Sequence, residues 1–210
     1  MKKLLRQTAL QTLKTSGAFR VMRESEWRRQ RLLILCYHGI SLDDEHHWRP
    51  FLYMRPEQFD RRLEVLRKGK YTVLPLAEAI ERLQRKDLPP RSVVLTFDDG
   101  PYDFYKLVVP RLKKYGFSAT VYLTTYYSEL QRPIFGLICS YMLWKARERG
   151  SVDLSDFGIP LALLATPGDR QAIVDQLSAW ADGKDYTGAQ KDQLAAELAG
   201  RLGIAYESLR

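Results

Sequence analysis

The sequence predicts an α/β fold over residues 32–127, in which parallel strands alternate with helices. Short apolar runs that end in polar or turn-forming residues recur along this stretch. Between them, apolar residues return at helical spacing. Strand–helix alternation of this kind favours parallel strands joined by crossover helices.

Each expected strand is short and rich in β-branched, aromatic or aliphatic residues. The four runs are residues 32–37, 71–74, 93–97 and 119–123. The first is continuously apolar, which predicts a strand buried on both faces. A polar loop, residues 41–55, follows it.

Three helices are expected between these strands. The first begins at Pro56, which suits a first helical turn, and ends at Gly69. The second covers residues 76–83 and stops before a Pro-Pro pair. The third covers residues 104–115, with Pro110 as a kink or restart and Gly116 as its cap.

The pattern changes after residue 128, where helical spacing continues and no strand run is convincing. One helix is expected from Leu137 to an end at Gly150, a second with Asp169 as its N-cap, and a third between Thr187 and Gly203. The expected organisation is therefore an arm over residues 1–31, an α/β part over 32–127 and a helical insertion or extension over 128–210.

The net charge of +8 is concentrated at the N-terminus. Residues 1–31 hold nine basic and two acidic side chains, which leaves a net charge of +1 for the rest of the chain. A nucleic-acid-binding domain would carry the positive charge on its folded face, so a nucleic-acid partner is not expected. The arm predicts either a solvated basic helix or a helix in peripheral contact with an anionic membrane.

Two kinds of membrane segment are not expected from the sequence. The apolar run after Lys3 stops at Arg6, which is too short for the core of a secretory signal. No stretch approaches the roughly 18 apolar residues of a transmembrane helix. The expected location is cytoplasmic or peripheral to the inner membrane surface.

The two cysteines, Cys36 and Cys139, both have apolar neighbours. Two cysteines form neither a disulfide framework nor a metal-binding pair at ligand spacing. Both are therefore expected to be buried free thiols.

Asp98 and Asp99 stand at the end of the third expected strand, and His38 follows the first. Ligands of parallel α/β folds bind where strands end at their carboxyl edges, so these residues are expected to share one site. Neighbouring side chains at a strand end point in different directions. One carboxylate could therefore bind a metal while the other faces an attacking water, although a bare Asp-Asp-Gly is also an ordinary turn.

The wider motif separates these alternatives. Val93 to Pro101 reads Val-Val-Leu-Thr-Phe-Asp-Asp-Gly-Pro, and a helix and Ser118-Ala-Thr-Val-Tyr-Leu123 follow it. Cys36-Tyr-His-Gly-Ile40 precedes it, as do residues 54–71 and the Leu-Pro-Pro join at 88–90. Together, residues 32–127 resemble the polysaccharide deacetylase family, the NodB-like or carbohydrate esterase 4 group.

The resemblance implies a fold and an activity. Members of this family form a distorted (β/α) barrel and hydrolyse N-acetyl, or in some cases O-acetyl, groups of glycans, thereby acting on non-peptide carbon–nitrogen bonds. They use a divalent metal, commonly Zn²⁺. By resemblance, Asp98 is the general base, Asp99 is a metal ligand and His38 lines the site. The implied partner is an acetylated amino-sugar polysaccharide or glycan.

The sequence departs from the family in its histidines. A His-x-x-x-His element, which supplies two metal ligands, and a later general-acid histidine are both absent. The remaining histidines, His46 and His47, precede the motif and are expected to be exposed. We therefore expect a partial barrel cut short within a helical insertion, with little activity as an isolated chain.

The alternative is a non-catalytic carbohydrate-binding or membrane-peripheral relative. Its sugar contacts would come from an aromatic-rich strip, Tyr122, Tyr126, Tyr127, Tyr141 and Trp144.

Overall fold

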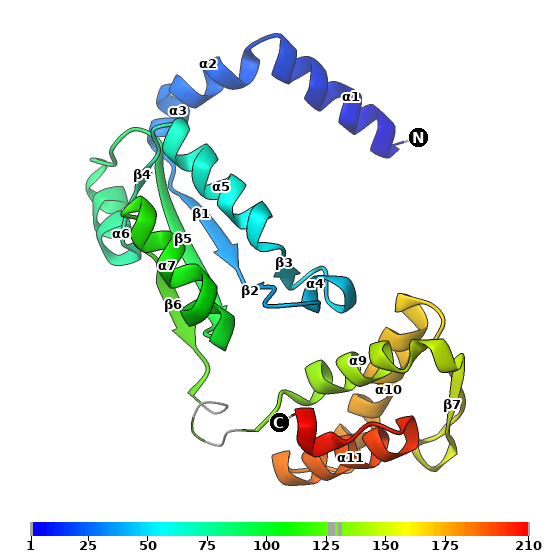
Figure 1. Ribbon diagram of the computed structural model, residues 1–210. Coiled ribbons are helices and arrows are strands. Elements are labelled where there is room, and N and C mark those ends of the chain that lie inside the picture. Colours follow the sequence, from blue (N-terminus) through cyan, green and yellow to red (C-terminus); the bar gives the residue numbers. More distant parts are fainter. Residues whose placement is uncertain (1, 126–128, 130–131, 210) are drawn as a thin grey trace. The chain divides into compact units, whose positions relative to one another are not determined.

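The computed structural model describes residues 2–125, 129 and 132–209 (Figure 1). The chain divides into two compact units. The first consists of the described residues up to Asp43 together with Phe51–Leu123, and the second of Asp44–Pro50 and the described residues from Thr124 onward.

The first unit is built on a parallel sheet with β5 (Ser92–Asp99) at its centre. Strand β1 (Leu33–Tyr37) pairs with one edge of β5. On the other edge, β4 (Thr72–Val73) pairs with the start of β5 and β6 (Thr120–Leu123) with its end. All these pairings are parallel, as the strand–helix alternation predicts, and an α/β fold is confirmed. Across the described residues the four strands form an open sheet.

Helices cover both faces of the sheet. On one face, α5 (Pro56–Lys68) and α7 (Val109–Tyr115) pack against alternate residues of β1 and β5. Their core is aromatic, because the rings of Tyr37 and Phe97 stack at 5.2 Å and Phe59 packs edge-on against both. On the opposite face, Val94 forms a smaller cluster that includes residues of α6 (Leu76–Arg85).

The helix signals of the first unit are confirmed. Helix α5 begins at Pro56 and ends at Gly69. A π-helical turn, η1 (Phe104–Val108), precedes α7, and Pro110 lies in the first turn of α7, as expected of a restart. Gly116 closes α7 with a left-handed φ of 65°.

The expected burial of the first strand on both faces is wrong. Leu33 and Ile34 are 38% and 49% exposed. Strand β1 is at the edge of the described sheet, and the described helices leave part of its surface uncovered. An apolar run therefore signals a strand without showing how many of its faces are covered.

The expected loop over residues 41–55 is also structured in part. It contains a one-turn helix, α4 (Glu45–Trp48), and a short strand, β3 (Tyr53–Met54). β3 pairs in parallel with β2 (Gly39–Ile40), immediately after His38. Elements of two to four residues are too short to leave a periodic pattern.

The second unit is mainly helical. Its helices α9 (Phe135–Lys145), α10 (Pro167–Asp182) and α11 (Gly188–Leu202) enclose one apolar core, as their spacing predicts. Short 3₁₀ turns complete it: η2 (Arg147–Arg149), η3 (Ser155–Phe157) and η4 (Tyr206–Leu209).

The expectation that residues 128–210 contain no strand is wrong. β7 (Ser151–Leu154) and β8 (Ile159–Leu163) form an antiparallel hairpin. Gly150 and Gly158, both at positive φ, precede these strands. Leu154 and Ala162 face the helical core, whereas Leu161 and Leu163 are exposed, so the apolar alternation is weak.

Both α10 and α11 begin with a threonine N-cap and a capping box, which confirms the expected cap of α11 and corrects that of α10. Thr187 caps α11 and exchanges hydrogen bonds with Gln190, as expected of an N-cap. Asp169 is not the cap of α10. Thr166 is, because Pro167 occupies the first helical position, and Asp169 completes the capping box from the third.

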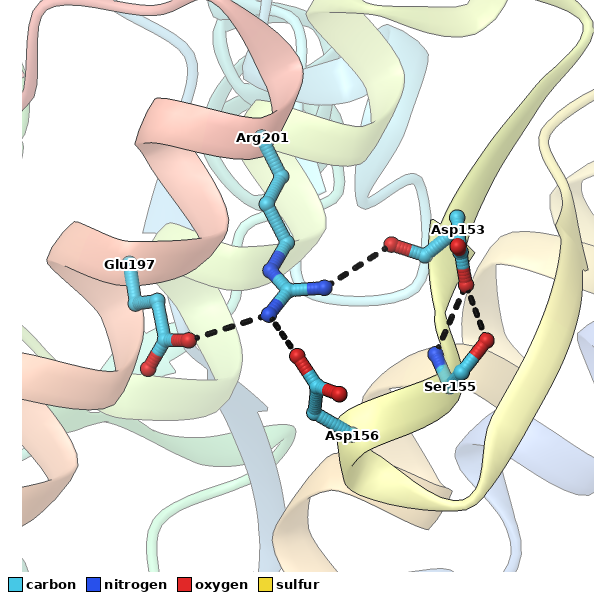
Figure 2. Close-up of polar contacts among 5 residues, drawn as sticks. All are labelled: Asp153, Ser155, Asp156, Glu197 and Arg201. Atoms are coloured by element: carbon cyan, nitrogen blue, oxygen red, sulfur yellow. Dashed lines mark hydrogen bonds and ion pairs between the residues drawn. The ribbon is translucent and has the colours of Figure 1, made fainter.

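Arg201 of α11 ties the helix to the β7 hairpin (Figure 2). Its guanidinium donates to the Asp153 carbonyl at 3.3 Å and to the Asp156 carboxylate at 2.5 Å. It also bonds Glu197 one turn earlier at 3.1 Å. The guanidinium lies 4.9 Å from the Phe157 ring centroid. The cluster links the end of a helix to a turn, which identifies it as structural.

The N-terminal arm forms three helices, α1 (Lys2–Thr15), α2 (Ala18–Glu24) and α3 (Glu26–Arg29). Leu5, Leu10 and Leu13 of α1 are 64%, 48% and 44% exposed. Arg28 donates a hydrogen bond to the Ser92 carbonyl at 3.3 Å, which anchors α3 to the start of the central strand β5. Within the described residues, every helix is too short or too polar to cross a bilayer.

Candidate functional site

Two paired strands bring the predicted site residues together. Strand β1 aligns Cys36 with Thr96 and Tyr37 with Phe97. Side chains alternate along a strand, so Cys36 and His38 emerge on the face that also carries Thr96 and Asp98. The intervening Tyr37 and Phe97 point into the aromatic core. The structure therefore places His38 beside Asp98, as the carboxyl-edge argument predicts.

The contacts converge on one carboxylate oxygen. The Cys36 thiol donates a hydrogen bond to Asp98 Oδ2 at 3.1 Å. His38 Nε2 lies 3.6 Å from the same oxygen. The His38 and Asp98 side chains are 43% and 32% exposed, so solvent reaches the site from one side.

Sequence reasoning missed Cys36. It was expected to be buried, but the structure shows it exposed. The hydrogen bond to Asp98 and, next, partial desolvation raise the pKa of the Cys36 thiol, while a hydrogen bond from Thr96 opposes them. The available signal was its spacing, because Cys36 lies two residues before His38 and must share its face of the strand. Cys139 is buried as expected, and burial raises the pKa of its thiol to about 12.

Asp99 diverges from Asp98, as expected of neighbours at a strand end. Strand β5 continues through both residues rather than ending at Phe97, and it pairs Asp99 with Leu123 of β6. Asp99 adopts a left-handed φ of 66° and is exposed, and Gly100 follows at 63°. Two consecutive left-handed residues turn the chain sharply out of the sheet.

Asp103 is a second residue that sequence reasoning missed. It is 4% exposed, and its Oδ2 accepts a hydrogen bond from the Ile40 backbone N–H at 2.6 Å. This bond joins the helical turn after Gly100 to strand β2, which begins one residue after His38. The only signal in the sequence was an acidic residue in the first turn after the Asp-Asp-Gly motif.

The other two histidines belong to the second unit. His46 and His47 lie on α4, with ring centroids 4.1 Å apart. His47 is exposed as expected, whereas His46 is partly buried. Neither is a member of the cluster around Asp98.

The expected aromatic strip does not emerge as one surface in the described residues. Tyr122 is 53% exposed on β6 of the first unit. Tyr141 packs against Trp48 and Trp144 in the second unit, at 5.4 and 6.2 Å between ring centroids. Tyr126 and Tyr127 lie outside the described residues.

One group of side chains has the composition of a metal site. A ligand atom each from Cys36, His38 and Asp98 lies within 4.8 Å of the others, and no other such trio of Cys, His, Asp or Glu occurs within the part of the chain that the structure describes. Asp99, the ligand implied by the resemblance, is not a member of this set.

Comparisons with known proteins agree with the motifs. Residues 85–151 match the family model for polysaccharide deacetylases. A candidate polysaccharide deacetylase of Bacillus subtilis (strain 168), YxkH, is 33% identical over 94 residues, which are 44% of this chain and 32% of that protein. The poly-β-1,6-N-acetyl-D-glucosamine N-deacetylase of Escherichia coli (strain K12) is 29% identical over 100 residues, 47% of this chain and 15% of the enzyme.

Among solved structures, the Streptococcus pyogenes deacetylase PplD in complex with acetate is similar to part of this chain. It is 35% identical, with a TM-score of 0.44, over 47% of this chain and 45% of that one. The chain thus spans about a third or less of the length of the two curated relatives. The resemblance to the polysaccharide deacetylase family is confirmed by the family model and the curated relatives, and the chain is similar to these proteins over part of its length.

Proposed function

We propose that this chain is part of a hydrolase that removes N-acetyl, or O-acetyl, groups from an acetylated amino-sugar polysaccharide or glycan. The observation that carries the proposal is the position of Asp98. Its carboxylate stands at the carboxyl end of the central strand, on a solvent-accessible face, with His38 Nε2 at 3.6 Å. This is the place at which parallel α/β folds collect their catalytic groups.

In the proposed reaction, Asp98 is the general base. Amide hydrolysis begins with water, a poor nucleophile, so a carboxylate that accepts its proton lowers the barrier. Thr96 is buried beneath the site, and the hydrogen bond that the Ile40 N–H donates to Asp103 holds the end of the first strand in place.

A divalent metal, with Zn²⁺ as our choice, is part of the proposal. Bound near the scissile group, it would polarise the acetyl carbonyl and acidify the attacking water. The resemblance implies a ligand set of Asp99 and two later histidines, but all three histidines of this sequence precede Asp99. A zinc site needs about three protein ligands, so this set does not fit the chain as it stands.

The same departure supports the second candidate, a non-catalytic relative that binds glycans or membranes. Such a protein would keep the fold without a complete set of metal ligands. The exposed leucines of α1 and its basic residues would supply the membrane contact. The proposed fold in both cases is a partial NodB-like barrel, because the open sheet leaves strand edges available for further pairing.

Acetate release from N-acetylglucosamine oligomers in the presence of Zn²⁺ distinguishes the two candidates. We expect weak turnover by the 210-residue chain that Asp98→Asn abolishes. Glu57→Gln, an exposed change on α5, is the matched control and should leave the turnover unchanged. Turnover that survives Asp98→Asn would refute the role of Asp98. Glycan binding without any acetate release, in the chain and in its Asp98→Asn variant alike, would favour the non-catalytic relative.

A further inference from the structure

We propose that the first unit binds Zn²⁺ through Cys36 Sγ, His38 Nε2 and Asp98 Oδ2. This ligand set differs from the one implied by the resemblance, which centres on Asp99. The proposal concerns binding alone and does not rest on deacetylase activity.

The distances fit a tetrahedral ion. Bonds of about 2.3 Å to sulfur and about 2.0–2.1 Å to nitrogen or oxygen place ligand atoms about 3.3–3.6 Å apart at tetrahedral angles. Sγ and Nε2 lie 3.1 and 3.6 Å from Oδ2, and all three atoms are within 4.8 Å of one another. Rotation of the exposed Cys36 and His38 side chains by up to about an ångström would bring the three atoms to these separations and seat the ion.

Paired strands hold the three ligand residues close together in the fold. Cys36 lies within β1 and His38 directly after it, two residues apart and therefore on one face. Asp98 lies two residues after Thr96, the strand partner of Cys36. Ligands whose backbones lie in, or directly next to, two hydrogen-bonded strands lose little backbone freedom when a metal binds.

The donor types select the metal. A thiolate with an imidazole favours zinc over magnesium or calcium, which prefer oxygen ligands. Three protein ligands leave the fourth tetrahedral position open, as in catalytic zinc sites. The open position agrees with the partial exposure of His38 and Asp98. The Thr96 hydroxyl, 3% exposed as a residue, hydrogen-bonds the cysteine sulfur and would orient it.

In this ligand set the two carboxylate oxygens of Asp98 have different roles. With Oδ2 on the metal, Oδ1 remains for a proton or a second partner. Asp99 is exposed, has a left-handed backbone conformation and is not a member of this set. The two ligand sets therefore make opposite predictions for substitutions at Cys36 and Asp99.

Co²⁺ titration of the full 210-residue chain tests the proposal, since cobalt replaces zinc and absorbs when bound. We expect a near-ultraviolet thiolate-to-cobalt charge-transfer band that zinc abolishes by competition. Cys36→Ser should remove this band, and His38→Gln and Asp98→Asn should each weaken binding at least about tenfold. Cys139→Ser and Asp99→Asn are the matched controls, and both should retain the band and the affinity.

Circular dichroism of each variant establishes that it is folded before the titration is interpreted. A chain that binds no Co²⁺, or a band that Cys139→Ser removes and Cys36→Ser does not, overturns the proposal. So does an affinity that falls with Asp99→Asn and not with Cys36→Ser. Metal binding without acetate release would refute only the proposed enzyme, and acetate release without a thiolate band would refute only this metal site.

Discussion

Asp103 offers a sharp test of how the candidate site is held, because it anchors a strand that it does not adjoin in sequence. Its buried carboxylate accepts a hydrogen bond from the Ile40 N–H at 2.6 Å, with both residues at or below 4% exposure. Asp103→Ala removes the acceptor and leaves a buried backbone donor without its partner. Asp103→Asn is the matched variant, since its amide oxygen can still accept.

The expected magnitude follows from the burial. An unpaired buried donor costs about 1–3 kcal/mol, and hydrogen bonds to charged groups contribute about 1.5–3 kcal/mol. We therefore expect Asp103→Ala to destabilise the first unit by about 2 kcal/mol or more, and Asp103→Asn by about half as much. The loss should centre on residues 33–41, where β1 and β2 lie on either side of His38.

Hydrogen exchange measured peptide by peptide reports on residues 33–41 separately from the second unit. This separation is needed because a chain of two units need not unfold in one step. A loss of 2 kcal/mol corresponds to about 30-fold faster exchange over residues 33–41. Exchange in α10 and α11 should be unchanged. If Asp103→Ala leaves exchange over residues 33–41 within about twofold of the unsubstituted chain, the bond does not hold this strand end and the reasoning is refuted.

Three further outcomes are expected. In the folded protein a thiol reagent should modify the exposed Cys36 and spare Cys139, because burial raises the pKa of the Cys139 thiol to about 12. Added Zn²⁺ should slow the modification of Cys36. Equal modification rates for the two thiols would contradict the structure. Gly100→Ala should cost about 1–2 kcal/mol in urea unfolding, because φ is 63° and the new Cβ would lie 2.7 Å from Leu123 Cδ1; an unchanged midpoint would refute the strained turn. Arg201→Met should lower the stability of the second unit by about 1 kcal/mol, measured as faster hydrogen exchange in β7. Arg201→Lys should restore little of this stability, because a single ammonium group cannot reach the same three acceptors.

The parts of the fold that the sequence predicted are those in which one local signal decides the outcome. Pro56, Gly69 and Gly116 mark helix ends by backbone geometry alone, and all three fall where expected. Thr187 caps its helix for the same reason. Asp169 was assigned one step wrongly, because either residue of a Thr-x-x-Asp box can cap a helix and Pro167 decides between them.

The parts that could not be predicted depend on contacts between distant residues. Leu33 and Ile34 belong to an apolar run, but their exposure depends on what covers the edge strand. The β7–β8 hairpin shares its inward-facing residues with three helices, so its own alternation is faint. A single sequence contains the residues of such contacts without their pairing.

The candidate site shows the same division. The carboxyl-edge rule brought His38 and Asp98 together correctly, because both positions follow from strand ends. The position of Cys36 depends on the register between β1 and β5. With Cys36 opposite Thr96, the thiol faces the site, whereas a shift of one residue would have turned it into the aromatic core. Residues of a site are thus selected by their parity along the strand as much as by their type, and a cysteine with apolar sequence neighbours comes to lie beside His38 and Asp98.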